Sequence, residues 1–290
     1  PPQGRAPSRS DPATMFAVMG TPPLPVLPDH RVLMAEANLR DLGGLPTSDG
    51  RTVRTGRLFR SGYLCDLDGP SLATVEGLGL RTIVDLRRPD EAEQRPHPDL
   101  DGTEVVHISV SADDNEFAVL ANLVEFDPEA IPGPTLIADY FRNSVRTRLD
   151  RYREVFDLAT DPDRHPLLFN CTAGKDRTGF VGGILLRLLG VAEDLAIADY
   201  LLSNDIRRPW LQEREDRHRQ VIADRLGVES DDVPDEQLVN TRAMMWCHAD
   251  YLTASFATVV DDWGTWEAFR RDGLGIDDAR IDAFHNSMLT

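Results

Sequence analysis

Short apolar runs alternate along the chain with longer segments of helical periodicity. Residues 82–86 (TIVDL) and 166–170 (PLLFN) are mostly apolar over the length of one strand, and 104–110 (EVVHISV) is a third strand candidate. Residues 135–160 repeat apolar side chains at spacings of three and four, and 179–189 is apolar on nearly all sides. These patterns predict a helix before the strand at 166–170 and a buried helix after it. Strands and helices in this order predict an α/β fold.

The segments on either side extend this arrangement. Residues 38–62 mix Gly-rich turn signals with short apolar stretches, which predicts small strands and a hairpin. Residues 71–80 have a helix-like pattern, and most of 194–288 also has helical periodicity. Asp277 and Asp278 precede an apolar pattern as residues at a helix N-terminus do, so one more helix is expected there.

Residues 1–30 differ from the rest of the chain. They carry eight prolines, few large apolar residues and no periodicity, which predicts a disordered or loosely packed tail. Residues 31–290 contain no internal repeat and are expected to form a single domain. The stretch from the strand candidate 104–110 to about residue 133 is acidic and is expected to form a lid.

Composition narrows the classes of partner and compartment. The formal net charge of −18 and the isoelectric point near 4.7 argue against nucleic acid or an anionic membrane as a primary partner. No apolar run approaches the length of a membrane span, so stable membrane insertion is not expected. Three widely spaced cysteines suit a reducing compartment, and prolines interrupt the weakly signal-like residues 15–27. A cytoplasmic protein is therefore expected, with secretion not indicated.

One segment combines residues that suit phosphate chemistry. Residues 170–179 read NCTAGKDRTG and lie between a predicted buried strand and a predicted buried helix. A loop that enters a helix N-terminus offers several N–H donors to a phosphate dianion, and Gly174 permits the backbone conformation that such a loop needs. Arg177 adds a planar fork for two phosphate oxygens, and the same positive field favours a thiolate at Cys171. Lys175 is the single lysine among 31 basic residues.

This loop and several further segments resemble the atypical bacterial group of protein tyrosine phosphatases. The matching segments occur in the family's order and cover about residues 36–288: NLRDLGG at 38–44, GRLFRSG at 56–62, TIVDLRRPDE at 82–91, CTAGKDRTG at 171–179, DYLLSN at 199–204 and WEAFRRDGLGI at 266–276. The resemblance implies a phosphatase-like α/β fold with a central, mostly parallel sheet flanked by helices. A helical lid and a helical C-terminal part complete the expected architecture.

The resemblance also implies a role for each residue of the loop. Cys171 would be the nucleophile that forms a phosphocysteine, and Thr178 would stabilise its sulfur as a leaving group. The phosphate would be bound by Thr172, Ala173, Gly174, Lys175, Asp176 and Arg177. Phosphotyrosine proteins would be the main substrates, with phosphoserine, phosphothreonine and phosphoinositide head groups as further ones, and Lys175 would add charge for a polyphosphorylated head group. No cofactor is implied, and the seven histidines show no metal-ligand spacing.

Two points stay open at the sequence level. Asp176 is a candidate proton donor, but Asp113 and Asp114 in the acidic lid compete for that role. Asn170 stands where the family normally has His, so thiolate stabilisation is expected to be weaker. A pseudophosphatase that binds phosphorylated ligands without turnover is therefore the alternative function, and a persulfide-forming sulfurtransferase is a more distant one. Asp85 is expected to order arginine side chains rather than to transfer protons.

Overall fold

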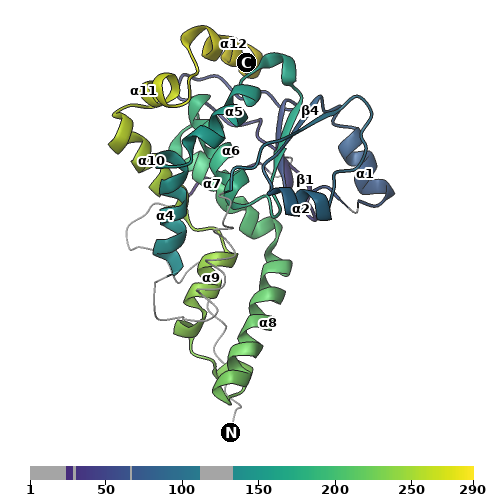
Figure 1. Ribbon diagram of the computed structural model, residues 1–290, viewed down its shortest axis with the longest axis vertical. Coiled ribbons are helices and arrows are strands. Elements are labelled where there is room, and N and C mark those ends of the chain that lie inside the picture. The colour runs from purple at the N-terminus through teal and green to yellow at the C-terminus, as the bar shows by residue number, and fades with distance from the viewer. Residues whose placement is uncertain (1–23, 29–30, 66, 112–132) are drawn as a thin grey trace.

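The sheet is the scaffold of the molecule. The computed structural model describes residues 24–28, 31–65, 67–111 and 133–290 (Figure 1). Its six strands are β1 (Val32–Met34), β2 (Leu39–Asp41), β3 (Leu58–Ser61), β4 (Thr82–Asp85), β5 (Glu104–His107) and β6 (Leu167–Asn170). They lie in the order β1-β2-β3-β6-β4-β5, with antiparallel pairing from β1 to β3 and parallel pairing from β3 to β5. The predicted α/β fold with a mostly parallel sheet is confirmed.

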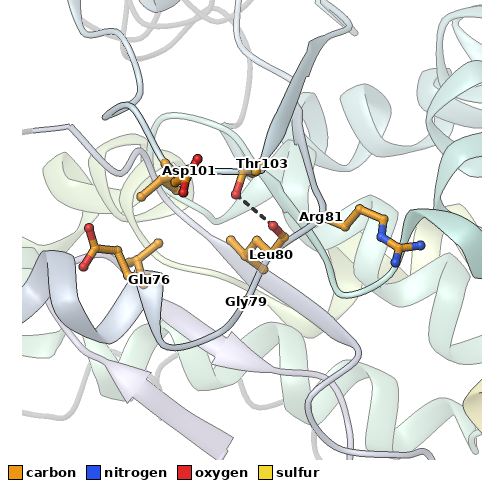
Figure 2. A pocket seen from close by; sticks show the side chains of 9 residues that line it. Glu76, Gly79, Leu80, Arg81, Asp101 and Thr103 are labelled. Atoms are coloured by element: carbon orange, nitrogen blue, oxygen red, sulfur yellow. Dashed lines mark hydrogen bonds between the residues drawn. The ribbon is translucent and has the colours of Figure 1, made fainter.

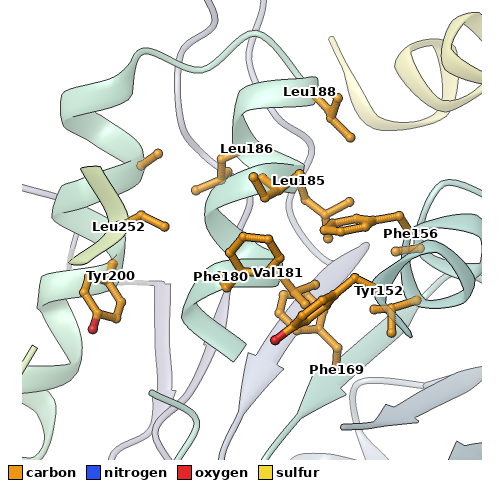
Figure 3. Packing of buried hydrophobic residues seen from close by; sticks show 14 of the residues in the cluster. Tyr152, Phe156, Phe169, Phe180, Val181, Leu185, Leu186, Leu188, Tyr200 and Leu252 are labelled. Carbon is orange, nitrogen blue, oxygen red and sulfur yellow. The ribbon is translucent and has the colours of Figure 1, made fainter. Parts of the chain in front are cut away.

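Both faces of the central strands are buried, which is why these strands read as continuous apolar runs. Leu167 and Phe169 of β6 belong to the main hydrophobic cluster, whereas Leu168 between them belongs to a second cluster on the opposite face. The main cluster packs the sheet against the helices that include Tyr152, Phe156 and Phe180 (Figure 3). The second cluster contains Val75 and so packs the other face against α1. Successive side chains point to opposite faces, and each face therefore has its own core.

Helices make up most of the remainder. They are α1 (Gly69–Glu76), α2 (Pro89–Gln94), α4 (Gly133–Arg146), α5 (Leu149–Ala159), α6 (Asp176–Leu188), α7 (Glu193–Ile206), α8 (Arg208–Leu226), α9 (Val239–Met245), α10 (Ala249–Trp263), α11 (Trp266–Ala268) and α12 (Asp278–Met288). The expected last helix is confirmed, because the Asp277 side chain caps α12 by accepting from the Arg280 N–H. Within the described residues, no helix is both long and apolar enough to cross a bilayer.

The segment 135–160 differs from its prediction as a single helix. It forms α4 and α5, which are separated at Thr147 and Arg148. The Thr147 hydroxyl donates to the Asn143 carbonyl at 3.2 Å, and the Arg148 guanidinium donates to the Tyr140 carbonyl at 3.1 Å while it lies over the Tyr140 ring. The N–H groups of Thr147 and Arg148 both donate to the Asn143 carbonyl at 3.0 Å, and the side-chain bonds add to this local pairing where α4 ends.

Two expectations fall mainly outside the described residues. The acidic lid, with Asp113 and Asp114, lies in 112–132, and most of the predicted tail lies in 1–23 and 29–30. Leu24 and Leu27, which fall within the predicted tail, pack partly buried against the main cluster. The domain boundary near residue 30 stays a prediction.

A buried ionic cluster joins the antiparallel edge of the sheet to α7. Asp199 of α7 accepts from Arg31 at 2.8 Å, from Arg40 at 3.3 Å and from Arg60 at 2.7 Å, and all four side chains are fully buried. Burial and the neighbouring Arg60 lower the pKa of Arg40 to about 9. Burial opposes the charge of Asp199, but the three arginines hold its pKa below the usual range. We call these four residues the Asp199 cluster.

Replacing Asp199 by Asn tests how far the fold depends on this cluster. Asp199→Asn keeps the shape but leaves three buried guanidinium groups without a carboxylate, so we expect a loss of about 3–5 kcal/mol in the free energy of unfolding at pH 7. Because the pKa of Asp199 is depressed in the folded state, its contribution is present above about pH 4 and declines as the pH falls further. Urea unfolding of both proteins from pH 7 to pH 3 measures the difference.

Asp272→Asn is the matched control, because Asp272 pairs with Arg271 on the surface. Exposed pairs contribute little, so this variant should unfold at nearly the same urea concentration as the parent protein. If Asp199→Asn also unfolded at nearly the parent's urea concentration, the fold would not depend on the Asp199 cluster.

Candidate active site

The candidate loop lies at the carboxyl edge of the parallel strands. β6 ends at Asn170, α6 begins at Asp176, and residues 171–175 connect them. Gly174 has a φ of 66°, in the left-handed region. A Cβ atom at Gly174 would lie 2.4 Å from the Gly62 backbone nitrogen, so only glycine fits at this point. The tight turn places Cys171, which is 2% exposed, beside the first turn of α6.

The carbonyl groups of this loop point outward and are held there by buried and half-buried side chains. Asn38 donates to the carbonyls of Ala173 at 3.2 Å and Gly174 at 3.1 Å. Arg60 of the Asp199 cluster donates to the Gly174 carbonyl at 3.0 Å. Arg207 donates to the Ala173 carbonyl at 3.1 Å. The sheet and α7 therefore fix the orientation of the loop's peptide groups.

The N–H groups of this loop point inward, opposite to its carbonyl groups. From Thr172 to Arg177, none of these six N–H groups donates to an acceptor within the described residues. They belong to a loop that continues into α6, whose N-terminus carries the positive end of the helix dipole. Such a group of backbone donors is an anion-binding nest.

Arg177 lies beside this nest and is almost fully buried. Its guanidinium forms a two-pronged ion pair with the Glu91 carboxylate, at 2.7 and 3.1 Å, and also donates to the Ser111 hydroxyl at 3.3 Å. Burial opposes the charge of Arg177, but Cys171 and Glu91 together raise its pKa above the ordinary value. The guanidinium is therefore always charged and faces both the cysteine and a carboxylate.

Glu91 is a site residue that the sequence analysis did not single out. Besides Arg177, its carboxylate accepts from the Thr172 hydroxyl at 2.6 Å and from the Arg88 N–H at 2.9 Å. Burial opposes its charge, but the bonds from Arg177 and Thr172 lower the pKa of Glu91 to about 2. The sequence position of Glu91 could have indicated this role. Glu91 follows β4, and the carboxyl end of β4 lies beside that of β6 at the same edge of the sheet.

Asp176 and Lys175 are bound to their surroundings. The Tyr200 hydroxyl donates to Asp176 Oδ1 at 3.2 Å, and Lys175 Nζ lies 3.4 Å from Asp176 Oδ2. Lys175 also donates to the carbonyl of Met245 at 3.1 Å and to that of Met244. The Tyr200 hydroxyl and Lys175 thus hold the Asp176 carboxyl group in place, and the two carbonyls hold Lys175 at the end of α9.

Asn170 and Asp85 form the base of the site. Asn170 Nδ2 lies 3.4 Å from Asp85 Oδ1 and 3.4 Å from the Cys171 carbonyl oxygen. Asp85 accepts from the Arg87 guanidinium at 2.7 to 3.1 Å, and His97 Nε2 lies 3.3 Å from Oδ2. Asp85 thus pairs with an arginine, as expected. Burial opposes the charge of Asp85, but His97 and Arg87 hold its pKa below the usual range.

The remaining candidates are Thr178 and the other two cysteines. The Thr178 hydroxyl is buried and has no hydrogen-bond partner within the described residues. Cys65 and Cys247 are also buried, neither belongs to the loop 171–175, and burial raises the pKa of Cys247 to about 12. Within the same part of the chain, no three His, Cys, Asp or Glu side chains are grouped to hold a metal ion.

A cavity of about 400 Å³ lies at the opposite edge of the sheet (Figure 2). Leu80, Arg81, Asp101 and Thr103 are among its lining residues, and they precede β4 and β5. The candidate loop follows the other end of the parallel strands. The cavity is therefore separate from the site.

Comparison with known proteins gives independent information about the family. A model described as the tyrosine phosphatase family matches residues 33–290. The chain is 33% identical over 249 residues to a Cupriavidus necator protein that is named provisionally as a tyrosine-protein phosphatase, with 84% of each chain covered. It is 30% identical over 285 residues to the triple specificity protein phosphatase PtpB of Mycobacterium tuberculosis, with 89% of this chain and 99% of the relative covered. The predicted resemblance is confirmed, and the chain belongs to the tyrosine phosphatase family.

Proposed function

We propose that the protein is a cysteine-dependent phosphatase that hydrolyses phosphotyrosine esters through a phosphocysteine intermediate. The observation that carries the proposal is the set of six N–H groups, from Thr172 to Arg177, that surround Cys171 without an acceptor in the described residues. Three equatorial phosphate oxygens would accept from these groups and from Arg177. A phosphate held in this way would present phosphorus to the sulfur of Cys171.

The reaction would proceed in two displacements. In the first, the Cys171 thiolate attacks phosphorus, an S–P bond forms, and the P–O bond to the tyrosine oxygen breaks as that oxygen takes a proton. In the second, a water molecule attacks phosphorus and loses a proton, and the S–P bond breaks to return the thiolate and free phosphate. The buried Thr178 hydroxyl would donate to the departing sulfur, which suits its lack of another described partner.

Asp176 would donate the first proton and accept the second. It lies inside the loop, at the first residue of α6. The Tyr200 hydroxyl and Lys175 Nζ lie beside its carboxyl group and would hold it in position. Asp113 and Asp114 remain rivals for this role, and both lie outside the described residues.

The range of substrates is a separate part of the proposal. The name of the mycobacterial relative gives three specificities for that protein. We extend the proposal accordingly to phosphoserine, phosphothreonine and phosphoinositide head groups as secondary substrates. Lys175 would contribute charge to a head group after exchanging its carbonyl acceptors at the end of α9 for phosphate oxygens. Turnover of a panel of phosphopeptides and soluble head groups measures the order of preference.

A pseudophosphatase is the second candidate, and Asn170 is the observation that favours it. Its amide approaches Asp85 and the Cys171 carbonyl oxygen, and it has no imidazole charge to offer a thiolate. Such a protein would bind phosphorylated ligands in the same nest. Release of phosphate from a simple aryl phosphate by the purified protein distinguishes the two functions.

The first variant tests the nucleophile. Cys171→Ser removes the thiolate but keeps the nest, so turnover should fall below detection while phosphotyrosine peptides still bind. Cys65→Ser and Cys247→Ser should keep most of the activity, because neither thiol lies in the loop. Phosphate release and peptide binding by fluorescence are the two measurements. Substantial turnover by Cys171→Ser would end the phosphocysteine mechanism.

The second variant tests the proton donor. A tyrosine oxygen leaves poorly without a proton, whereas p-nitrophenolate leaves readily, so loss of the acid must depend on the leaving group. Asp176→Asn should therefore reduce kcat for a phosphotyrosine peptide at least tenfold more than kcat for p-nitrophenyl phosphate. Asp113→Asn and Asp114→Asn serve as the comparison. If one of these lid variants shows the dependence and Asp176→Asn does not, Asp176 only organises the loop.

The third variant tests the carboxylate that holds Arg177. A phosphate dianion in the nest would share this guanidinium with Glu91, and the two anions would repel each other. Glu91→Gln keeps the shape and removes the negative charge, so the inhibition constant of inorganic phosphate should fall severalfold. Competition assays at pH 6 to 8, where Glu91 is fully ionised, measure it. An unchanged or higher constant would mean that Glu91 positions Arg177 instead of competing with phosphate.

A further inference from the structure

Two aromatic rings and three arginines gather beside the candidate loop. The Tyr63 N–H donates to the Thr172 carbonyl at 3.2 Å, which attaches Tyr63 to the loop. The Arg95 guanidinium lies over the Tyr63 ring at 4.9 Å and donates to its hydroxyl at 2.5 Å. Arg207, which holds the Ala173 carbonyl, lies 4.0 Å from the centre of the Trp210 ring, and Arg214 lies 4.8 Å from it. We call these five residues the rim cluster.

The rim cluster is open to solvent. Trp210 is 41% exposed, Arg95 and Arg214 are exposed, and Tyr63 and Arg207 are half-buried. Tyr63 and Arg207 donate to the carbonyls of the adjacent residues Thr172 and Ala173, so the two halves of the cluster meet at the loop. A molecule with its phosphate in the nest would therefore extend over these side chains.

The positive charge of the rim cluster is not neutralised by the acidic side chains beside it. Asp205 pairs with Arg208 at 2.6 Å, and Glu213 pairs with Arg217 at 2.7 Å. Within the described residues, no carboxylate lies in ion-pair distance of Arg95, Arg207 or Arg214. In a chain of net charge −18, such a group of arginines is a local exception. It fits an anionic partner.

The length of the rim cluster indicates the kind of anion. The guanidinium groups of Arg207 and Arg214 both contact the Trp210 ring, at 4.0 and 4.8 Å from its centre, so they are at most about 9 Å apart. An extended peptide covers about 7 Å with two residues, so two of its side chains can reach both groups. Arginine and tryptophan are also side chains that contribute strongly to peptide and protein interfaces.

We propose that the rim cluster is a specificity subsite for acidic residues that flank the phosphotyrosine of a protein substrate. The inference rests on the proposed phosphatase function. Arg207 donates to the carboxylate nearest the phosphate, and Arg214 donates to one about two residues away. The Trp210 ring keeps both guanidinium groups oriented along α8, which extends away from the sheet (Figure 1).

Matched phosphotyrosine peptides test the subsite. One peptide carries three Glu before the phosphotyrosine, one carries them after it, and one carries Gln at all these positions. We expect the better acidic peptide to exceed the Gln peptide about tenfold in kcat/KM at low salt, and we expect this ratio to fall towards one at about 0.5 M salt. A ratio near one at low salt would overturn the proposal.

Two charge reversals on α8 identify the residues responsible. Arg214→Glu should lower the acidic-to-Gln ratio about tenfold, and Arg214→Gln should lower it by less. Arg217→Glu makes the same change of charge on the same helix, but Arg217 pairs with Glu213 outside the rim cluster. Its ratio should match that of the parent protein. Equal losses in Arg214→Glu and Arg217→Glu would show only a general charge effect and would overturn the subsite.

The same variants distinguish a failure of the subsite proposal from a failure of the proposed phosphatase function. If no phosphorylated ester is turned over, the proposed function fails, and the affinity ratio of the acidic and Gln peptides for Cys171→Ser still tests the subsite. If peptides are turned over without any acidic preference, only the subsite fails. Turnover of a soluble head group such as inositol trisphosphate is the third measurement. Loss of its turnover in Arg214→Glu, with an unchanged peptide ratio, would assign the rim cluster to lipids and overturn the proposal.

Discussion

The orientation of the peptide groups in residues 171–177 is the constraint on which the candidate site depends. Peptide N–H groups can converge on one point only if their carbonyl groups turn away and find donors elsewhere. Asn38, Arg60 and Arg207 provide those donors behind the loop. Arg60 is in turn held by Asp199 together with two further buried arginines, so the anion nest is only as rigid as the Asp199 cluster.

The charges around the loop follow from the same arrangement. The Asp199 cluster sets three guanidinium groups against one carboxylate, and Arg177 adds a further buried cation beside Cys171. Because buried charges are weakly screened, this excess favours anions in the loop strongly. Glu91 supplies one such anion and pairs with Arg177. An acidic protein can therefore carry a candidate site for an anion, since the local field differs in sign from the net charge.

Much of the fold could be predicted from sequence because burial on both faces gives each central strand an apolar run. β4 and β6 were visible in this way, and so was the Gly-containing loop that links β6 to α6. The buried side chains that hold the loop could not be predicted from the sequence. Asp199 meets Arg31, Arg40 and Arg60 across more than 130 residues of chain, and such contacts leave no local pattern. The break between α4 and α5 was missed because side-chain bonds at Thr147 and Arg148 override a continuous apolar periodicity.

Glu91 links the two halves of the site. Its backbone belongs to α2, and its carboxylate caps the start of that helix through the Arg88 N–H while it holds Arg177 and Thr172. Arg95 follows at the C-terminal end of α2 and lies over Tyr63, whose N–H binds the loop. A movement of α2 that released Arg177 would therefore shift Arg95 as well. Occupation of the nest and the position of Arg95 are therefore mechanically connected through this one short helix.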